Sequence, residues 1–212
     1  YYNSKNEQEP ANYYFCDTHI KLKTSINQNN QLVYSQLSGK DNLVLGIEGL
    51  ANIDFDWDWG NSTKNISWRY IPNSNYIATT RLSKTKYNFI VDFSIDFNPN
   101  SSLSDTSTTA LSSGSTDLDL LLDNLVEDID FNQNVKFVIS DDMSFDAGWQ
   151  IKQLNLEYRE VYGGQEYTNL QSTPEIYSTF FNITFKPNPI FHVNTGLRAS
   201  KYNRYKNLLL NP

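Results

Sequence analysis

The sequence contains few of the residues on which most enzyme mechanisms depend. Its 212 residues include one Cys and two His. Cys16 and His19 lie three positions apart in a predicted strand, so their side chains should point to opposite faces and not form a nucleophile–base pair. The chain has no G-x-S-x-G motif and neither glycine fingerprint for phosphate binding. We therefore predict that the protein is not an enzyme and has no catalytic residues and no cofactor.

Two further absences concern covalent and membrane structure. The single Cys excludes an intramolecular disulfide. No run of roughly 18 consecutive apolar residues is present to form a transmembrane helix.

The first residues, YYNSKNEQ, include neither an initiator Met nor an apolar signal region. We expect either that residues have been removed from the start or that the numbering begins within a longer product.

Cations are fewer than anions. Lys and Arg number 17 against 24 Asp and Glu, which gives a net charge of −7 and a pI near 4.8. This balance argues against a nucleic-acid binder, which needs a basic surface, and against binding to an anionic membrane surface. The exception is GLRASKYNRYKNLLLNP, residues 196–212, with four cations and no acid; the rest holds 13 cations and 24 acids. We predict no specific nucleic-acid partner and no membrane partner.

Alternation of apolar and polar residues dominates the chain and predicts strands. The clearest run is YNFIVDFSIDF, residues 87–97, and further strands are predicted over 20–26, 43–49, 66–71, 135–140, 149–161 and 177–185. Within 149–161, Trp149 and Ile151 share one parity whereas Leu154 and Leu156 have the other, which indicates a β-bulge. Gly163 and Gly164 are predicted to form a hairpin turn.

Only one segment has helical periodicity. In residues 117–128, DLDLLLDNLVED, four Leu follow the i, i+3, i+4, i+7 pattern, namely Leu118, Leu121, Leu122 and Leu125. The Ser/Thr-rich stretch before it, residues 99–117, is expected to be a mobile loop. We predict an all-β fold: one antiparallel β-sandwich or jelly-roll-like domain over 1–195, with this short helix and a basic C-terminal arm over 196–212.

The stretch NIDFDWDWGN, residues 52–61, has an aromatic face and an acidic face. The aromatic face is a core, a subunit contact or a ligand platform; a platform would stack sugar rings on Trp57, Trp59, Trp68 and Tyr70. The acidic face, Asp54, Asp56 and Asp58, either prevents pairing with other strands or forms a functional wall. Repeated around a ring of subunits, it would line an acidic lumen that repels DNA.

Metal binding is considered for two acidic groups. Successive carboxylates in the row from Asp54 to Asp58 are about 6.6–7 Å apart along a strand, too far for one Ca²⁺. Residues 140–148, SDDMSFDAG, bring together Asp141, Asp142 and Asp146, without the EF-hand pattern. These three are a candidate cation site, the alternative being a solvated turn, and we predict no metal.

Three features favour a structural protein of a multi-copy assembly. The positive C-terminal arm suits docking on a negative neighbouring copy. The Ser/Thr-rich loop and the Tyr- and Asn-rich composition suit an extracellular particle. The strand-and-turn segment WQIKQLNLEYREVYGG, residues 149–164, resembles such segments of tailed-phage virion proteins.

We therefore predict a structural, non-enzymatic subunit of a virion, such as a phage head, neck or tail protein, located in the virion or outside the cell. Its partners would be copies of itself or other subunits. Contacts would come from the arm residues Arg198, Lys201, Arg204, Tyr205, Lys206, Leu208 and Leu209. The alternative is a carbohydrate- or surface-binding β-sandwich module of a bacterial cell-surface protein.

Overall fold

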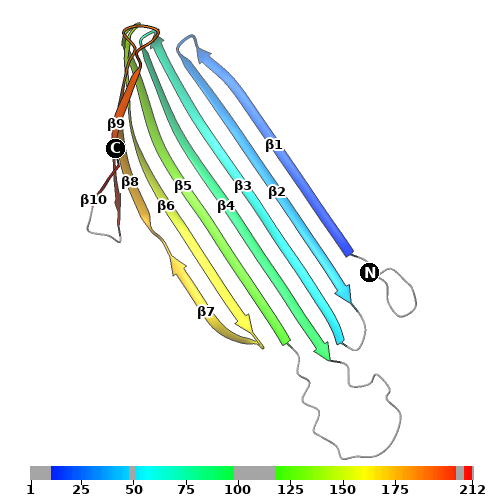
Figure 1. The fold of residues 1–212 in the computed structure, drawn as a ribbon. Coiled ribbons are helices and arrows are strands. Elements are labelled where there is room, and N and C mark those ends of the chain that lie inside the picture. Colours follow the sequence, from blue (N-terminus) through cyan, green and yellow to red (C-terminus); the bar gives the residue numbers. More distant parts are fainter. Residues whose placement is uncertain (1–10, 48–50, 98–117, 204–207, 212) are drawn as a thin grey trace, which may run out of the picture.

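The described strands form one antiparallel sheet in which chain neighbours pair (Figure 1). The computed structural model describes residues 11–47, 51–97, 118–203 and 208–211. Its strands are β1 (Ala11–Asn27), β2 (Asn30–Ile47), β3 (Ala51–Asn73), β4 (Tyr76–Phe97), β5 (Leu118–Ser140), β6 (Met143–Tyr162), β7 (Gln165–Ser172), β8 (Glu175–Phe185), β9 (Val193–Tyr202) and β10 (Leu208–Asn211). β7 and β8 pair with β6 one after the other, on either side of a break at Pro174.

The all-β prediction is confirmed, but the predicted sandwich is not. The described strands make a single layer, with β1 at one edge and β9 and β10 at the other. A sandwich buries the inner face of each sheet, whereas Ala78 is the only buried hydrophobic residue in the described part of the chain. Neither face of this sheet is therefore covered by a second layer of the described chain.

The short helix predicted over 117–128 is corrected to a strand. From Leu118 onwards these residues belong to β5, which pairs with β4 on one side and β6 on the other. The leucines at helical spacing are divided between the two faces of the sheet. Pairing along both edges of β5 supplies backbone hydrogen bonds over its whole length and outweighs a local helical pattern.

The predicted C-terminal arm is, where described, part of the sheet. Arg198 and Lys201 lie in β9, and Leu208 and Leu209 lie in β10. Arg204, Tyr205 and Lys206 lie outside the described residues, as does the predicted mobile loop over 99–117. Within the described residues, no helix is long and apolar enough to cross a membrane.

Each long strand changes its apolar face halfway along. Residues directly opposite in an antiparallel pair lie on the same face. We call the face that carries Phe55 and Trp57 face 1, and the face that carries Asp54 face 2. In Figure 1 the lower half is the end at which β4 ends and β5 begins. In the lower half most of the apolar residues lie on face 1, with exceptions such as Leu121 and Leu125, and in the upper half most lie on face 2.

This change of face accounts for the parity slip in residues 149–161, and the predicted β-bulge is wrong. The pairing of β6 with β5 runs without a register shift from Tyr162 to Ser144. Ile151 lies on face 2, opposite Phe131, and Leu154 lies on face 1, opposite Asp128. The slip therefore marks the point at which the apolar face changes, with no extra residue in the strand.

Three of the four connections at the upper end of the sheet are short, and the fourth, residues 186–192 between β8 and β9, has seven residues. Two-residue turns join β1 to β2, β3 to β4 and β5 to β6, at residues 28–29, 74–75 and 141–142. At the lower end, the predicted turn at Gly163 and Gly164 is confirmed. Their φ angles of 56° and 74° are both positive, as a type I′ hairpin turn requires.

Two glycines on face 1 permit close packing in the upper half. A Cβ on Gly148 would lie 2.6 Å from Phe180 Cε1 and 2.7 Å from the Gln133 carbonyl oxygen, and one on Gly196 would lie 2.7 Å from the Phe181 carbonyl oxygen. Because backbone atoms must move, we expect Gly148→Ala and Gly196→Ala each to cost roughly 1–2 kcal/mol of stability.

Gly46→Ala is the control for these two substitutions, measured by urea unfolding. Its Cβ would lie 3.5 Å from Asp54 Oδ1, an ordinary contact. It should be neutral or slightly stabilising, since Ala restricts the unfolded chain. Equal losses at all three positions would contradict the close packing at Gly148 and Gly196.

Candidate functional site

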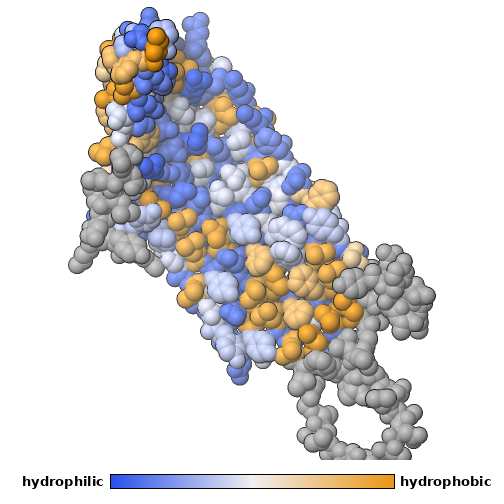
Figure 2. Space-filling model, viewed as in Figure 1, coloured by the Kyte–Doolittle hydropathy of each residue, from blue (hydrophilic) through white to orange (hydrophobic). Residues whose placement is uncertain are grey.

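An apolar surface covers face 1 of the lower half. In Figure 2 apolar side chains gather over the lower ends of the strands, while hydrophilic ones cover the middle of the sheet. We call this surface the lower apolar band. Its residues are Tyr13, Phe15, Leu43, Leu45, Ile47, Ile53, Phe55, Trp57, Trp59, Phe89, Val91, Phe93, Ile95, Leu118, Leu120, Leu122, Tyr158 and Tyr162.

Trp57 lies at the centre of an aromatic cluster in this band. Its ring centroid is 4.6 Å from Trp59, 5.8 Å from Phe89 and 6.2 Å from Phe55. Its buried indole N–H has no hydrogen-bond partner among the described residues. Such packing, with a donor that bonds to nothing, is typical of a hydrophobic contact rather than of a sugar site.

The four aromatics of the predicted ligand platform do not form one surface. Trp57 and Trp59 lie on face 1 in the lower half, whereas Trp68 and Tyr70 lie on face 2 in the upper half. Trp68 and Tyr70 are neighbours, with ring centroids 6.1 Å apart. At most two of the four can therefore contact one ligand.

The three predicted carboxylates lie together on face 2, behind the lower apolar band. Asp58 pairs with Lys40 at 2.9 Å, and this carboxylate raises the pKa of Lys40. Asp56 accepts a hydrogen bond of 2.7 Å from Asn42 Nδ2. Further acids on this face of the lower half are Asp92, Asp96, Asp119, Asp123 and Glu157. We call these eight acids the acidic patch.

A second apolar surface covers face 2 of the upper half, and we call it the upper apolar band. Its residues are Ile20, Leu22, Leu32, Tyr34, Ile66, Trp68, Tyr70, Tyr76, Leu82, Ile129, Phe131, Val135, Phe137, Phe145, Trp149, Ile151, Tyr177, Phe181, Ile183, Phe185, Val193 and Leu197. Many of these are strongly exposed; Ile66 and Leu82, for example, are both 47% exposed.

Polar and mostly cationic side chains lie on face 1 behind the upper apolar band. The cations are Lys21, Lys23, Arg69, Arg81, Lys136, Lys152 and Arg198, and the acids are Asp128, Asp130 and Asp146. The sequence reasoning missed both this surface and the upper apolar band as continuous surfaces. The change of parity of the apolar residues within 149–161 was the sequence pattern that could have indicated these surfaces.

Around β5, β8 and β9, face 1 is the more enclosed side of the upper half, although Ala78 on face 2 of β4 is also buried. Asp130 is 6% exposed, whereas its chain neighbours Ile129 and Phe131 on face 2 are 47% and 37% exposed. Ser178 and Ser200 on face 1 are also buried, and their hydroxyl oxygens lie 2.9 Å apart. In this part of the upper half the enclosed side is therefore polar and the open side is mainly apolar.

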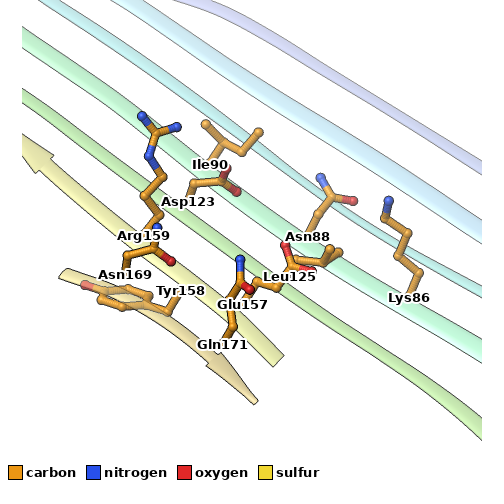
Figure 3. Close-up of a pocket in the computed structure, with 10 residues that line it drawn as sticks. All are labelled: Lys86, Asn88, Ile90, Asp123, Leu125, Glu157, Tyr158, Arg159, Asn169 and Gln171. Atoms are coloured by element: carbon orange, nitrogen blue, oxygen red, sulfur yellow. The ribbon is translucent and has the colours of Figure 1, made fainter. Parts of the chain in front are cut away.

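A polar hollow of about 350 Å³ lies mainly on face 2, across β4 to β7 (Figure 3). Its lining carries Lys86 and Arg159 as well as Asp123 and Glu157. Arg159 Nε donates to Glu166 at 3.2 Å, and Lys86 lies 3.8 Å from Glu127. The hollow offers hydrogen-bonding groups to a polar ligand, but charges of both signs do not select the charge of that ligand.

The candidate cation site is not assembled. Asp141 and Asp142 lie in the turn between β5 and β6, and Asp146 lies in β6 opposite Lys136. In the part of the chain that the structure describes, no group of three or more His, Cys, Asp or Glu side chains is placed to hold a metal ion. Cys16 and His19 lie on opposite faces of β1, as predicted.

Comparisons with known proteins assign no family. No family model matches the chain, and no curated protein matches it. Among solved structures, it is similar to the ferric yersiniabactin uptake receptor FyuA from Yersinia pestis, with 9% identity and a TM-score of 0.49. The match covers 92% of this chain and 33% of the receptor, so the chain spans about a third of the receptor's length. We infer neither fold nor function from this likeness.

Proposed function

We propose that this chain is a structural, non-enzymatic sheet whose upper half crosses a membrane, with face 2 towards the lipid. One observation carries the proposal: around β5, β8 and β9 the enclosed side of the upper half is polar and the open side is mainly apolar. A protein folded in water has the opposite arrangement, because burying apolar surface drives its folding. Lipid favours an apolar outer face, and the polar face then lines a space that contains water.

The dimensions of the upper apolar band support this orientation. From Ile129 to Phe137, both in the band, β5 rises by roughly 26–27 Å along the strand. A strand inclined by about 40° would then cover about 20–21 Å of membrane thickness, compared with the apolar height of about 25 Å expected for membrane strands. Three of the four connections next to the band have only two residues each, and the fourth, residues 186–192, has seven; short turns are usual on one side of such membrane sheets.

The prediction of no membrane partner rests on the net charge of −7. In the structure the acidic side chains and the upper apolar band occupy different halves of the sheet. The acidic patch lies in the lower half, away from the upper apolar band. Repulsion from an anionic surface therefore does not oppose insertion of the upper half, whose outward side chains are mainly uncharged.

The sheet edges specify what else this function requires. All seventeen residues of β1 are exposed, and among the described strands β1 pairs only with β2. In lipid, unpaired backbone N–H and C=O groups each cost several kcal/mol. Strands from the same protein or from another copy must therefore pair with β1 and with the edge formed by β9 and β10.

The four Trp residues test the orientation directly, because each apolar band contains two of them. The double variant Trp57→Phe with Trp59→Phe leaves Trp68 and Trp149 in the upper apolar band. The double variant Trp68→Phe with Trp149→Phe leaves the pair in the lower apolar band. In vesicles whose acyl chains are brominated, we expect strong fluorescence quenching only for the first variant, since bromine quenches on contact within the hydrocarbon region.

The double variant Trp68→Phe with Trp149→Phe is the control for non-specific adsorption to the vesicles. Such adsorption would weakly quench the fluorescence of both Trp pairs. Quenching of Trp57 and Trp59 alone would place the lower half in the lipid and overturn the orientation. No quenching in either variant, with folded protein confirmed by circular dichroism, would overturn the membrane proposal.

The second candidate function is the subunit of a multi-copy assembly, such as a virion, in which copies cover each other's apolar bands. The exposed edge of β1 favours it, because a free edge pairs readily with another chain. Light scattering in buffer without detergent separates the two functions. A water-soluble particle of defined mass favours the assembly, whereas material that dissolves only with detergent or lipid favours the membrane sheet.

A further inference from the structure

A hollow on face 1 of the upper half gathers two arginines and no acid. Its volume is about 190 Å³, and its polar lining comes from Arg81, Asn132, Asn134, Gln150, Ser178 and Arg198. Arg81 and Arg198 belong to β4 and β9, separated by three strands, and both reach this hollow. The local charge is therefore positive, in a chain that is negative overall.

Neither arginine is neutralised by a carboxylate in the described part of the chain. Arg198 Nη2 donates to Gln150 Oε1 at 3.0 Å, and Arg81 has no ion pair within the described residues. The nearby Asp130 is already engaged, since it accepts hydrogen bonds from Asn132 and Gln150 and lies 3.8 Å from Lys152 Nζ. Asp130 is thus engaged by other side chains and forms no ion pair with either arginine of the hollow.

Gln150 holds Arg198 in place. The Gln150 amide donates through Nε2 to Asp130, so its oxygen must face Arg198. Gly148 keeps the adjacent space open, because a Cβ there would lie 2.6 Å from both Asn134 Oδ1 and Phe180 Cε1. The hollow therefore has one pre-oriented guanidinium, one free guanidinium and a neighbouring amide from Asn134.

We propose that this hollow binds an oxyanion with several equivalent oxygens, a phosphate or sulfate group. Guanidinium groups bind such anions through paired, charge-assisted hydrogen bonds, which are stronger than neutral ones. Two of them approaching from opposite sides can engage different oxygens of one anion. The hollow lies on face 1, the polar face, so a dissolved anion can reach it from water. This inference does not depend on the membrane proposal.

Isothermal titration of the full chain in neutral detergent at low ionic strength tests the site with inorganic phosphate. We expect saturable binding to the native protein and at least about a tenfold weaker affinity, roughly 1.4 kcal/mol, for Arg81→Ala and for Arg198→Ala. Arg69→Ala is the matched control, since Arg69 lies on face 1 and does not line the hollow. Its affinity should be unchanged.

The source of the anion is distinguished by a second arm with mixed micelles that contain phosphatidic acid. Tighter binding to these micelles than to phosphate, lost in Arg81→Ala, identifies a lipid headgroup; equal affinities identify a free anion. No saturable binding of either probe to the folded native protein would overturn the site. An equal loss in Arg69→Ala would overturn it too, because it would indicate diffuse attraction by a positive surface.

Discussion

Thr80→Arg should destabilise the protein folded in a phospholipid bilayer by about 2–4 kcal/mol, whereas Thr79→Arg should destabilise it by less than about 1 kcal/mol. The two residues are adjacent in β4 and identical, so they differ only in the face they occupy. Thr80 lies on face 2 between Trp68 and Gln133, halfway along the upper apolar band. Thr79 lies on face 1 between Arg69 and Asn134.

The physical reason for the difference is desolvation. At position 80 the guanidinium would enter the hydrocarbon region, where a charge has no water and no partner. At position 79 it would enter a hydrated surface, with only mild repulsion from Arg69 directly opposite.

Reversible urea unfolding in thin phospholipid vesicles, followed by Trp fluorescence, measures both values. The reverse order of effects would mean that face 1 contacts the lipid. Two small and equal effects would mean that the upper half of the sheet lies in water.

Trp57→Ala should destabilise the protein by about 2–4 kcal/mol in detergent, because it removes the centre of the aromatic cluster in the lower apolar band. The centroids of three rings lie within 6.2 Å of the Trp57 ring centroid. This loss does not depend on which face meets lipid, so it tests the packing of the sheet separately from its function.

Two controls bracket this value. Trp57→Phe retains a ring and removes the unpartnered indole N–H, so we expect a change within about 1 kcal/mol. Trp68→Ala should cost about 1 kcal/mol, since Trp68 is 44% exposed and keeps one ring neighbour and a hydrogen bond of 2.9 Å to Asn30. Equal losses for Trp57→Ala and Trp68→Ala would contradict a central role for Trp57.

Local patterns in the chain predicted most strands of this fold. Period-two alternation located the segments that became β4, β6 and β8, and two adjacent glycines marked the turn after β6. The row from Asp54 to Asp58 and the separation of Cys16 from His19 were also predictable. In each case the period of a strand, which is a property of the backbone alone, decides the face of a side chain.

Two failures concern the face that carries the apolar residues. The spacing of Leu118, Leu121, Leu122 and Leu125 suggested a helix, whereas these residues are divided between the two faces of β5. The parity slip in β6 suggested a bulge, because that expectation assumes one apolar face for each strand. The sheet instead changes its apolar face halfway along each long strand. The candidate site was affected in the same way, since Trp57 and Trp68 lie in one strand but on opposite faces and in different halves.

The sequence by itself determined that this protein is made of strands, that aromatic and acidic side chains alternate in its third strand, and that few residues suit nucleophilic chemistry. Only the tertiary structure decided that the strands form a single layer, that Arg81 and Arg198 meet in one hollow, and that the polar face of the upper half is the enclosed one. The reason is that alternation depends on neighbours in the chain. Enclosure and shared sites depend on the register of strands far apart in sequence, which no local pattern encodes.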